Sequence, residues 1–157
     1  FIEKQDPATY LGLRGHGKVG LKWAGWVSLA LVIYFFLQDQ FVLQKGVHFN
    51  LGWDQWVNII ILVGFIEEVV FRGFILRRLM DQFQFWKANM ITALLFLSIH
   101  FPIWFDKGLF GSPAILGTFL NIIVISLVFG YIYKKTHSLW SVIITHSIYN
   151  LLASIFN

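Results

Sequence analysis

The chain has 157 residues, of which 57% are hydrophobic and only 13% are charged. This composition leaves too little polar surface for a soluble domain and predicts an integral membrane protein. The net charge of +4 does not indicate a nucleic-acid partner, because the cations lie between apolar segments and form no basic helix. The chain contains no cysteine, which excludes disulfides, thiolate zinc sites and cysteine nucleophiles.

The first residues mix charged side chains with four glycines and predict a solvated juxtamembrane lead-in over residues 1–20. Within it, Asp6 and Pro7 could start one helical turn at the membrane interface, although a solvated stretch is the favoured interpretation. The chain begins with Phe1 rather than Met, so we expect further residues upstream. The remaining residues, 21–157, are predicted to form one transmembrane domain.

Apolar runs separated by polar or basic connections predict about five transmembrane helices. Tryptophans at the start of the first run agree with a membrane interface there. We therefore expect an all-α, polytopic transmembrane helical bundle. The predicted spans are Leu21–Leu37, Trp53–Met80, Phe85–Phe101, Pro113–Tyr133 and Leu139–Phe156.

The second predicted span carries three ionisable residues in its middle, Glu67, Glu68 and Arg72. Each would cost about 2.5–3.5 kcal/mol in hydrocarbon, so we expect them to face protein or a wet cavity. Glu68 and Arg72 are four residues apart and share a helix face, which predicts an ion pair. Glu67 lies about 100° around the helix from Glu68 and has no partner on its own helix. A carboxylate held among apolar neighbours in this way is a candidate general base.

The third predicted span ends in the sequence LFLSIHFP. Pro102 disfavours helix at the residue before it and removes one hydrogen bond of the preceding turn, which predicts a helix break just after His100. Such a break at membrane depth is tolerated only inside protein or beside water. Residues 103–112 are predicted to form a loop or a re-entrant turn, with Ser112 and Pro113 starting the next helix.

The basic residues predict an orientation in the membrane. Nine of them fall on one side of the five predicted spans and two on the other, so the positive-inside rule makes the first side cytoplasmic. We expect a multi-pass protein of the cell membrane. The nine are Lys4, Arg14, Lys18, Lys22, Arg77, Arg78, Lys87, Lys134 and Lys135, and the two are Lys45 and Lys107.

Three polar residues on three predicted helices share a similar depth. Measured from the nearest cytoplasmic cation at ~1.5 Å per residue, Glu67 lies ~15 Å, His146 ~16 Å and His100 ~20 Å into the membrane. His146 and Asn150 are four residues apart on the fifth predicted helix, so both can donate hydrogen bonds to one point, as an oxyanion requires. With Glu67 as the base, the set suffices for attack of water on a carbonyl. This predicts one polar site in the inner to middle part of the bilayer.

Other interpretations stay open on the residues alone. Glu67, His100 and His146 could equally bind zinc and leave one position open, although the H-E-x-x-H spacing of the zincins is absent. A single polar residue in a membrane helix more often makes a helix-to-helix hydrogen bond. Buried carboxylates and histidines also serve proton or ion pathways.

Three short motifs stand in order on three predicted helices. Residues 67–72, EEVVFR, fit the pattern E-E-x-x-x-R; residues 96–100, FLSIH, fit F-x-x-x-H; and residues 146–150, HSIYN, fit H-x-x-x-N. Together they resemble the CAAX protease and bacteriocin-processing family of intramembrane proteases, which includes the CAAX prenyl endopeptidase. The resemblance covers residues 59–157, the motif-bearing core of the predicted domain.

The resemblance implies an endopeptidase that hydrolyses a peptide bond of a membrane-associated peptide, either prenylated or a leader peptide. It implies that Glu67 activates the attacking water and that His100 helps to orient it. His146 and Asn150 would then form the oxyanion site, and Glu68 with Arg72 would be the supporting ion pair. Such proteins are often called metalloproteases, yet a glutamate-activated water without metal is also proposed for them, so the sequence does not choose between zinc and no cofactor.

The implied partners are a peptide or a C-terminally lipidated protein as substrate, together with membrane lipids, and no nucleic acid. The same resemblance leaves a second function open, because some relatives are assigned to bacteriocin self-immunity or to membrane scaffolding. In that case the chain would be a non-catalytic immunity or partner-binding protein.

Overall fold

A computed structural model describes residues 6–156 of the chain. Within this range every regular element is helical, which confirms the predicted all-α class. Three helical stretches are long and apolar enough to cross a membrane, and the chain is an integral membrane protein. These stretches are Gly17–Val42, Phe85–Asp106 and Ile115–Thr136.

The elements are α-helices interspersed with segments of π or 3-10 geometry, which are labelled η. In chain order they are α1 (Pro7–Tyr10), α2 (Gly17–Gln38), η1 (Asp39–Leu43), η2 (Gln55–Val63), α3 (Gly64–Glu68), η3 (Val69–Leu76), α4 (Arg77–Met80), α5 (Phe85–Ser98), α6 (Phe101–Asp106), η4 (Leu109–Gly111), α7 (Ile115–Thr136) and α8 (Leu139–Ile155).

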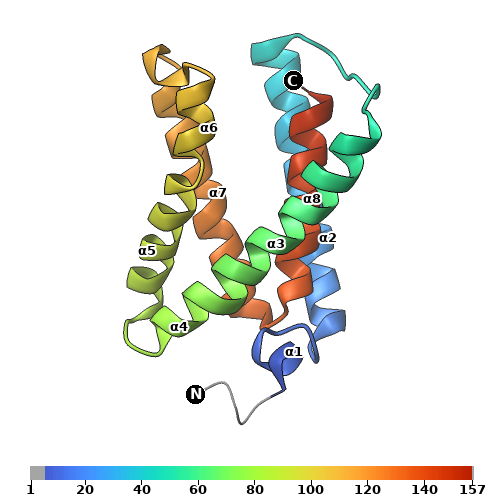
Figure 1. Ribbon diagram of the computed structural model, residues 1–157. Helices are drawn as coiled ribbons and strands as arrows, with labels where there is room; N and C mark the ends of the chain where they lie inside the picture. The colour runs from blue at the N-terminus through green and yellow to red at the C-terminus, as the bar shows by residue number, and fades with distance from the viewer. Residues whose placement is uncertain (1–5, 157) are drawn as a thin grey trace.

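Two further helical stretches coincide with predicted spans. Segments η2, α3, η3 and α4 follow one another without a break and form one rod (Figure 1). Helix α8 is apolar but has only 17 residues. Neither stretch is among the three that are long and apolar enough to cross a membrane, so the count of five spans stays a prediction.

The helices form two arms that meet at one end of the molecule and diverge toward the other (Figure 1). One arm consists of α5, α6 and α7, and the other of α2 and α8; α5 packs along α7, α2 packs along α8, and the rod crosses from α8 to α5. The hydrophobic core lies where α7 and α8 meet η3, and includes Leu76, Phe129, Ile132, Leu139 and Val142. This core holds the middle of the rod against both arms, which is where the ionisable residues of the second predicted span lie.

Close approach of α5 and α7 depends on a glycine. A Cβ added at Gly130 would fall on the Asn89 side-chain oxygen, so only glycine fits there. Asn89 is fully buried, and its side-chain Nδ2 donates to the Leu127 carbonyl at 2.9 Å. The small residue therefore lets a polar side chain of one helix bond the backbone of the next, as is common in membrane bundles.

The chain bends where Pro102 predicted a break. Helix α5 ends at Ser98, and α6 begins at Phe101 with Pro102 in its first turn, where proline is tolerated because its missing N–H would have had no partner. The predicted loop over residues 103–112 was wrong for residues 103–106, because proline initiates a new helix here as well as ending the old one.

The start of the next helix also differs slightly from the expectation. The Ser112 hydroxyl accepts a hydrogen bond from the Ala114 backbone N–H at 3.2 Å. Helix α7 then begins at Ile115, two residues after the predicted start at Pro113. At the other end of the chain, Asp6 caps α1 and Pro7 is its first residue, which is the alternative that the sequence left open.

Candidate active site

An ion pair between α3 and η3 lies at the centre of the bundle. Arg72 Nη1 donates to Glu68 Oε1 at 2.8 Å, and both side chains are fully buried. The other terminal nitrogen of Arg72 donates to the hydroxyl of Ser126 on α7 at 2.7 Å and to its carbonyl at 3.0 Å. The contact that the i, i+4 spacing predicted is therefore present, and α7 holds it in place. Its role in supporting catalysis stays a prediction.

His146 on α8 joins this pair through one ring nitrogen. Its Nδ1 lies 2.7 Å from Glu68 Oε1, the same oxygen that accepts from Arg72. Because Glu68 is paired with a guanidinium and acts as an acceptor, Nδ1 carries the proton. The second ring nitrogen, Nε2, is then free to accept a hydrogen bond in the neutral imidazole.

Two phenylalanines enclose the cluster from the opposite arm. The Phe96 ring centroid lies 4.8 Å from the Arg72 guanidinium carbon and 6.0 Å from the His146 ring. The corresponding distances for Phe129 are 5.4 Å and 5.2 Å. Both rings favour a cation at their faces and keep lipid and water away from it. The two arms of the bundle are thus joined through a charged cluster that packs against two aromatic rings.

Glu67 lies beside the cluster and not within it. Its Oε2 is 3.8 Å from His146 Nε2, which is too long for a direct hydrogen bond. The Glu67 side chain is 20% exposed, against 6% for His146. Of the two neighbouring carboxylates, Glu67 is therefore the one that a small molecule can reach, because Glu68 is fully buried.

His100 lies at the bend between α5 and α6. Its Nδ1 is 2.8 Å from the Phe96 carbonyl, which accepts a hydrogen bond when that nitrogen is protonated. Its ring packs against Phe96 and Trp104. Because the Phe96 ring also contacts the His146 ring, it links the two histidines. The structure thus brings Glu67, His100 and His146 into one neighbourhood from three elements.

The Asn150 side chain bonds the backbone of η2. Its Nδ2 donates to the Ile59 carbonyl of η2 at 2.9 Å, and within residues 6–156 its side chain makes no hydrogen bond to the other predicted site residues. This bond ties α8 to the rod. The predicted convergence of Asn150 with His146 on one point is not seen in this arrangement.

The side chains present do not form a metal-binding set. Among residues 6–156, no three His, Asp or Glu side chains are grouped so that they could hold a metal ion. His146 has one nitrogen engaged by Glu68, and His100 has one engaged by Phe96. Zinc binding by Glu67, His100 and His146 stays a prediction from the sequence.

Sequence reasoning missed one residue of this cluster. Ser126 is fully buried and bonds Arg72 through two oxygens. Its only signal was a hydroxyl in an otherwise apolar span, which is common in membrane helices and does not identify a partner.

One comparison with known protein families gives a match. Residues 48–152 match the model of the family described as type II CAAX prenyl endopeptidase Rce1-like. The matched range contains all three motifs, with Glu67, Arg72, His100, His146 and Asn150. No curated protein and no solved structure matches the chain significantly.

Proposed function

Because the chain belongs to the type II CAAX prenyl endopeptidase Rce1-like family, we propose that it is an intramembrane endopeptidase that uses Glu67 to activate water. Membership of a protease family supports the reaction class. The family description also supports a prenylated or otherwise membrane-associated peptide as the substrate.

One observation supports the mechanism most. Glu67 Oε2 and His146 Nε2 face each other at 3.8 Å, while Nδ1 of the same imidazole is fixed on Glu68. A water molecule beside this gap can lie within about 2.8 Å of both atoms, which is ordinary hydrogen-bond distance. Glu68, held by Arg72, thus sets the tautomer that turns an unprotonated nitrogen toward Glu67.

The proposed reaction is hydrolysis by a general base. Glu67 takes a proton from the water as the oxygen attacks the peptide carbonyl carbon. The carbonyl oxygen gains the negative charge of the tetrahedral intermediate. The proton then passes from Glu67 to the leaving nitrogen, the carbon–nitrogen bond breaks, and a carboxylate and an amine are released.

The two histidines would support this step in different ways. His146, with Nε2 unprotonated, would accept a hydrogen bond from the attacking water and hold it beside Glu67. His100, with one nitrogen on the Phe96 carbonyl, has its other nitrogen available to orient water. The oxyanion role of Asn150 requires its amide to leave the Ile59 carbonyl when substrate binds.

The test is turnover of a membrane-presented reporter peptide by the purified chain in nanodiscs. Glu67→Gln keeps the shape of the side chain and removes the base, so we expect turnover to fall about 100-fold or more. Asp106→Asn is the matched control, because it makes the same change at an exposed carboxylate at the end of α6. Unchanged turnover in Glu67→Gln would remove this residue from the mechanism.

A further inference from the structure

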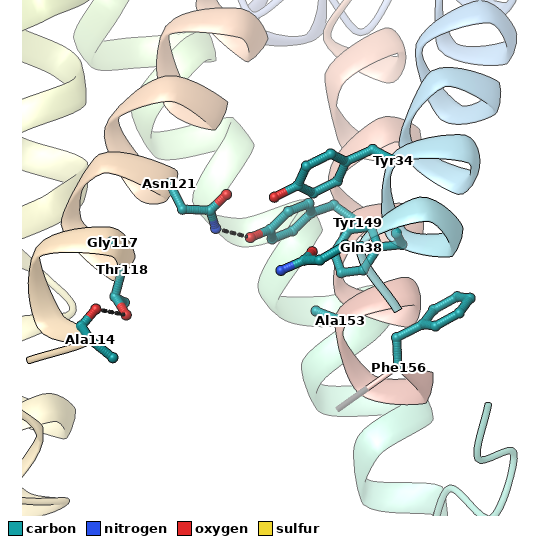
Figure 2. A pocket seen from close by; sticks show the side chains of 10 residues that line it. Tyr34, Gln38, Ala114, Gly117, Thr118, Asn121, Tyr149, Ala153 and Phe156 are labelled. Atoms are coloured by element: carbon teal, nitrogen blue, oxygen red, sulfur yellow. Dashed lines mark hydrogen bonds between the residues drawn. The ribbon is translucent and has the colours of Figure 1, made fainter. Parts of the chain in front are cut away.

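A cavity of about 630 Å³ lies between α2, α7 and α8, and Glu67, His100 and His146 are not among its lining residues (Figure 2). A second cavity of about 620 Å³ adjoins it on the same three helices. The two share four lining residues and so form one continuous cleft. The shared residues are Tyr34, Gly117, Asn121 and Tyr149.

Polar groups are concentrated in the first part of this cleft. Asn121 Nδ2 donates to the Tyr149 hydroxyl at 2.6 Å, which links α7 to α8. Figure 2 shows the Tyr34 hydroxyl and the Gln38 amide directed into the space toward Asn121. Within residues 6–156, neither of these two groups makes a hydrogen bond, and the Asn121 side-chain oxygen accepts none.

These unpartnered groups lie within helices that are candidate membrane spans. In a bilayer, a polar group without a partner is unfavourable by several kcal/mol, because the hydrocarbon offers no hydrogen bonds. Three such groups around one cavity therefore indicate a ligand that satisfies them.

The chemistry of the lining favours one class of ligand. The free groups include donors (the Tyr34 hydroxyl and the Gln38 amide N–H) and acceptors (the Asn121 and Gln38 amide oxygens). No charged side chain lines either cavity. Ester oxygens of a lipid can only accept, and a phosphate would lie here without a cation. A peptide backbone is uncharged and presents both an N–H and a C=O at each residue.

The second part of the cleft is suited to apolar groups. Its walls away from the shared residues are aliphatic, formed by Val27, Leu31, Leu120, Val124 and Val128. This second part can therefore hold the apolar side chains of a bound peptide segment whose backbone lies in the polar part of the cleft.

We propose that the cleft between α2, α7 and α8 binds an uncharged, apolar peptide segment of the substrate, away from the bond that is cleaved. This inference rests on the proposed peptidase function. Tyr149 lies three residues from His146 on α8, about 5 Å along the helix axis. A segment held at Tyr149 therefore approaches the imidazole from the neighbouring turn, and the cleft selects substrates without charge in that segment.

The experiment measures equilibrium binding of a fluorescent, uncharged apolar decapeptide to the full chain in nanodiscs, with empty nanodiscs subtracted. We expect Asn121→Leu to weaken binding about tenfold, since it removes both an acceptor and the bond that positions Tyr149. Tyr34→Phe removes one hydroxyl that has no partner in the protein, so it tests the cleft without disturbing the fold, and we expect binding about threefold weaker.

The matched control is Thr118→Val. Thr118 lines the same cavity, but its hydroxyl donates to the Ala114 carbonyl of its own helix (Figure 2). We expect its affinity to match the wild type. Equal affinity in wild type, Asn121→Leu and Tyr34→Phe would overturn the proposal, as would equal binding of a peptide with a central lysine. Native mass spectrometry that finds a glycerolipid bound to wild type and lost in Asn121→Leu would also overturn it.

A second measurement separates this inference from the proposed function. Glu67→Gln should bind the decapeptide as tightly as wild type while it loses turnover of the reporter. Full turnover in Glu67→Gln would contradict the catalytic proposal alone, because the titration does not depend on cleavage. Loss of turnover in Glu67→Gln, with no effect of Asn121→Leu on binding, would contradict the cleft alone.

Discussion

The charged cluster around Glu68, Arg72 and His146 and the cleft at Asn121 both place polar groups inside apolar helices, but in opposite ways. In the cluster, charged groups are fully or almost fully buried and bond one another, and aromatic rings enclose them. In the cleft, the polar groups are neutral, and the side chains of Asn121 and Tyr34 are exposed to the cavity and its surroundings.

The difference follows from the free energy of removing each group from water. A buried charge needs a partner held in a fixed geometry at all times, since the penalty for losing it is several kcal/mol. A neutral amide or hydroxyl without a partner is also unfavourable in hydrocarbon, but less so than a charge, so a ligand that binds reversibly can supply its partner. We therefore expect the cluster to be a rigid part of the molecule and the cleft to be a binding site. Three substitutions test this contrast through the free energy of unfolding.

The largest effect is expected at Arg72. Arg72→Met leaves the Glu68 carboxylate buried without its cation and removes the donor that Ser126 accepts from. We expect a loss of about 3–5 kcal/mol in the free energy of unfolding, measured by denaturation in mixed micelles.

A double variant sharpens this prediction. Glu68→Gln combined with Arg72→Met removes both charges, so we expect it to recover a large part of the loss. If Arg72→Met alone changed the free energy of unfolding by less than about 1 kcal/mol, the pair would not be the rigid element described here.

An intermediate effect is expected from adding one methyl group at the contact between α5 and α7. Gly130→Ala has no room, because its Cβ would meet the buried Asn89 amide. We expect a loss of about 1–3 kcal/mol in the free energy of unfolding, as for other overpacked interiors.

Gly117 on the same helix is the matched control for Gly130→Ala. It faces the cleft, and a Cβ there meets nothing within 4 Å. Gly117→Ala should leave stability unchanged or slightly raised, because alanine favours a helix. Equal destabilisation by both changes would mean that the two faces of α7 do not differ as described.

The smallest effect on stability is expected at Asn121. Asn121→Leu removes its hydrogen bond to Tyr149. Side-chain hydrogen bonds between membrane helices contribute on average about 0.6 kcal/mol, so we expect a loss of that order in the same denaturation assay. A loss above about 2 kcal/mol would show that this bond holds the arms together and would assign the cleft to the rigid part of the molecule.

The ion pair of the charged cluster could be predicted from the sequence because its two residues are close together in the chain. Glu68 and Arg72 are four residues apart on one helix, so a single turn decides their contact. The three motifs identified the family, which the family match confirms. Pro102 identified the bend beside His100, although the sequence pattern did not show that the chain resumes a helix at once.

Other features of the site could not be read from spacing. Asn150 shares a helix face with His146, yet its amide bonds the Ile59 carbonyl, because η2 happens to pass within reach of that turn of α8. Ser126 bonds Arg72 across 54 positions of sequence, a distance that no local rule covers. The cleft requires α7 to diverge from the packed pair of α2 and α8 by the right amount, which depends on the packing of all three helices.

The sequence by itself determined that this chain is an all-α membrane protein of a protease family, and that one helix carries a carboxylate with a paired neighbour. These properties depend on composition, on helical periodicity and on short motifs, which are all local. Only the tertiary structure decided which imidazole nitrogen faces Glu67, that Asn150 bonds η2, and that α2, α7 and α8 leave a polar cleft open. Those outcomes depend on how separate helices pack, because the position of one helix relative to another is fixed by contacts between residues far apart in the chain.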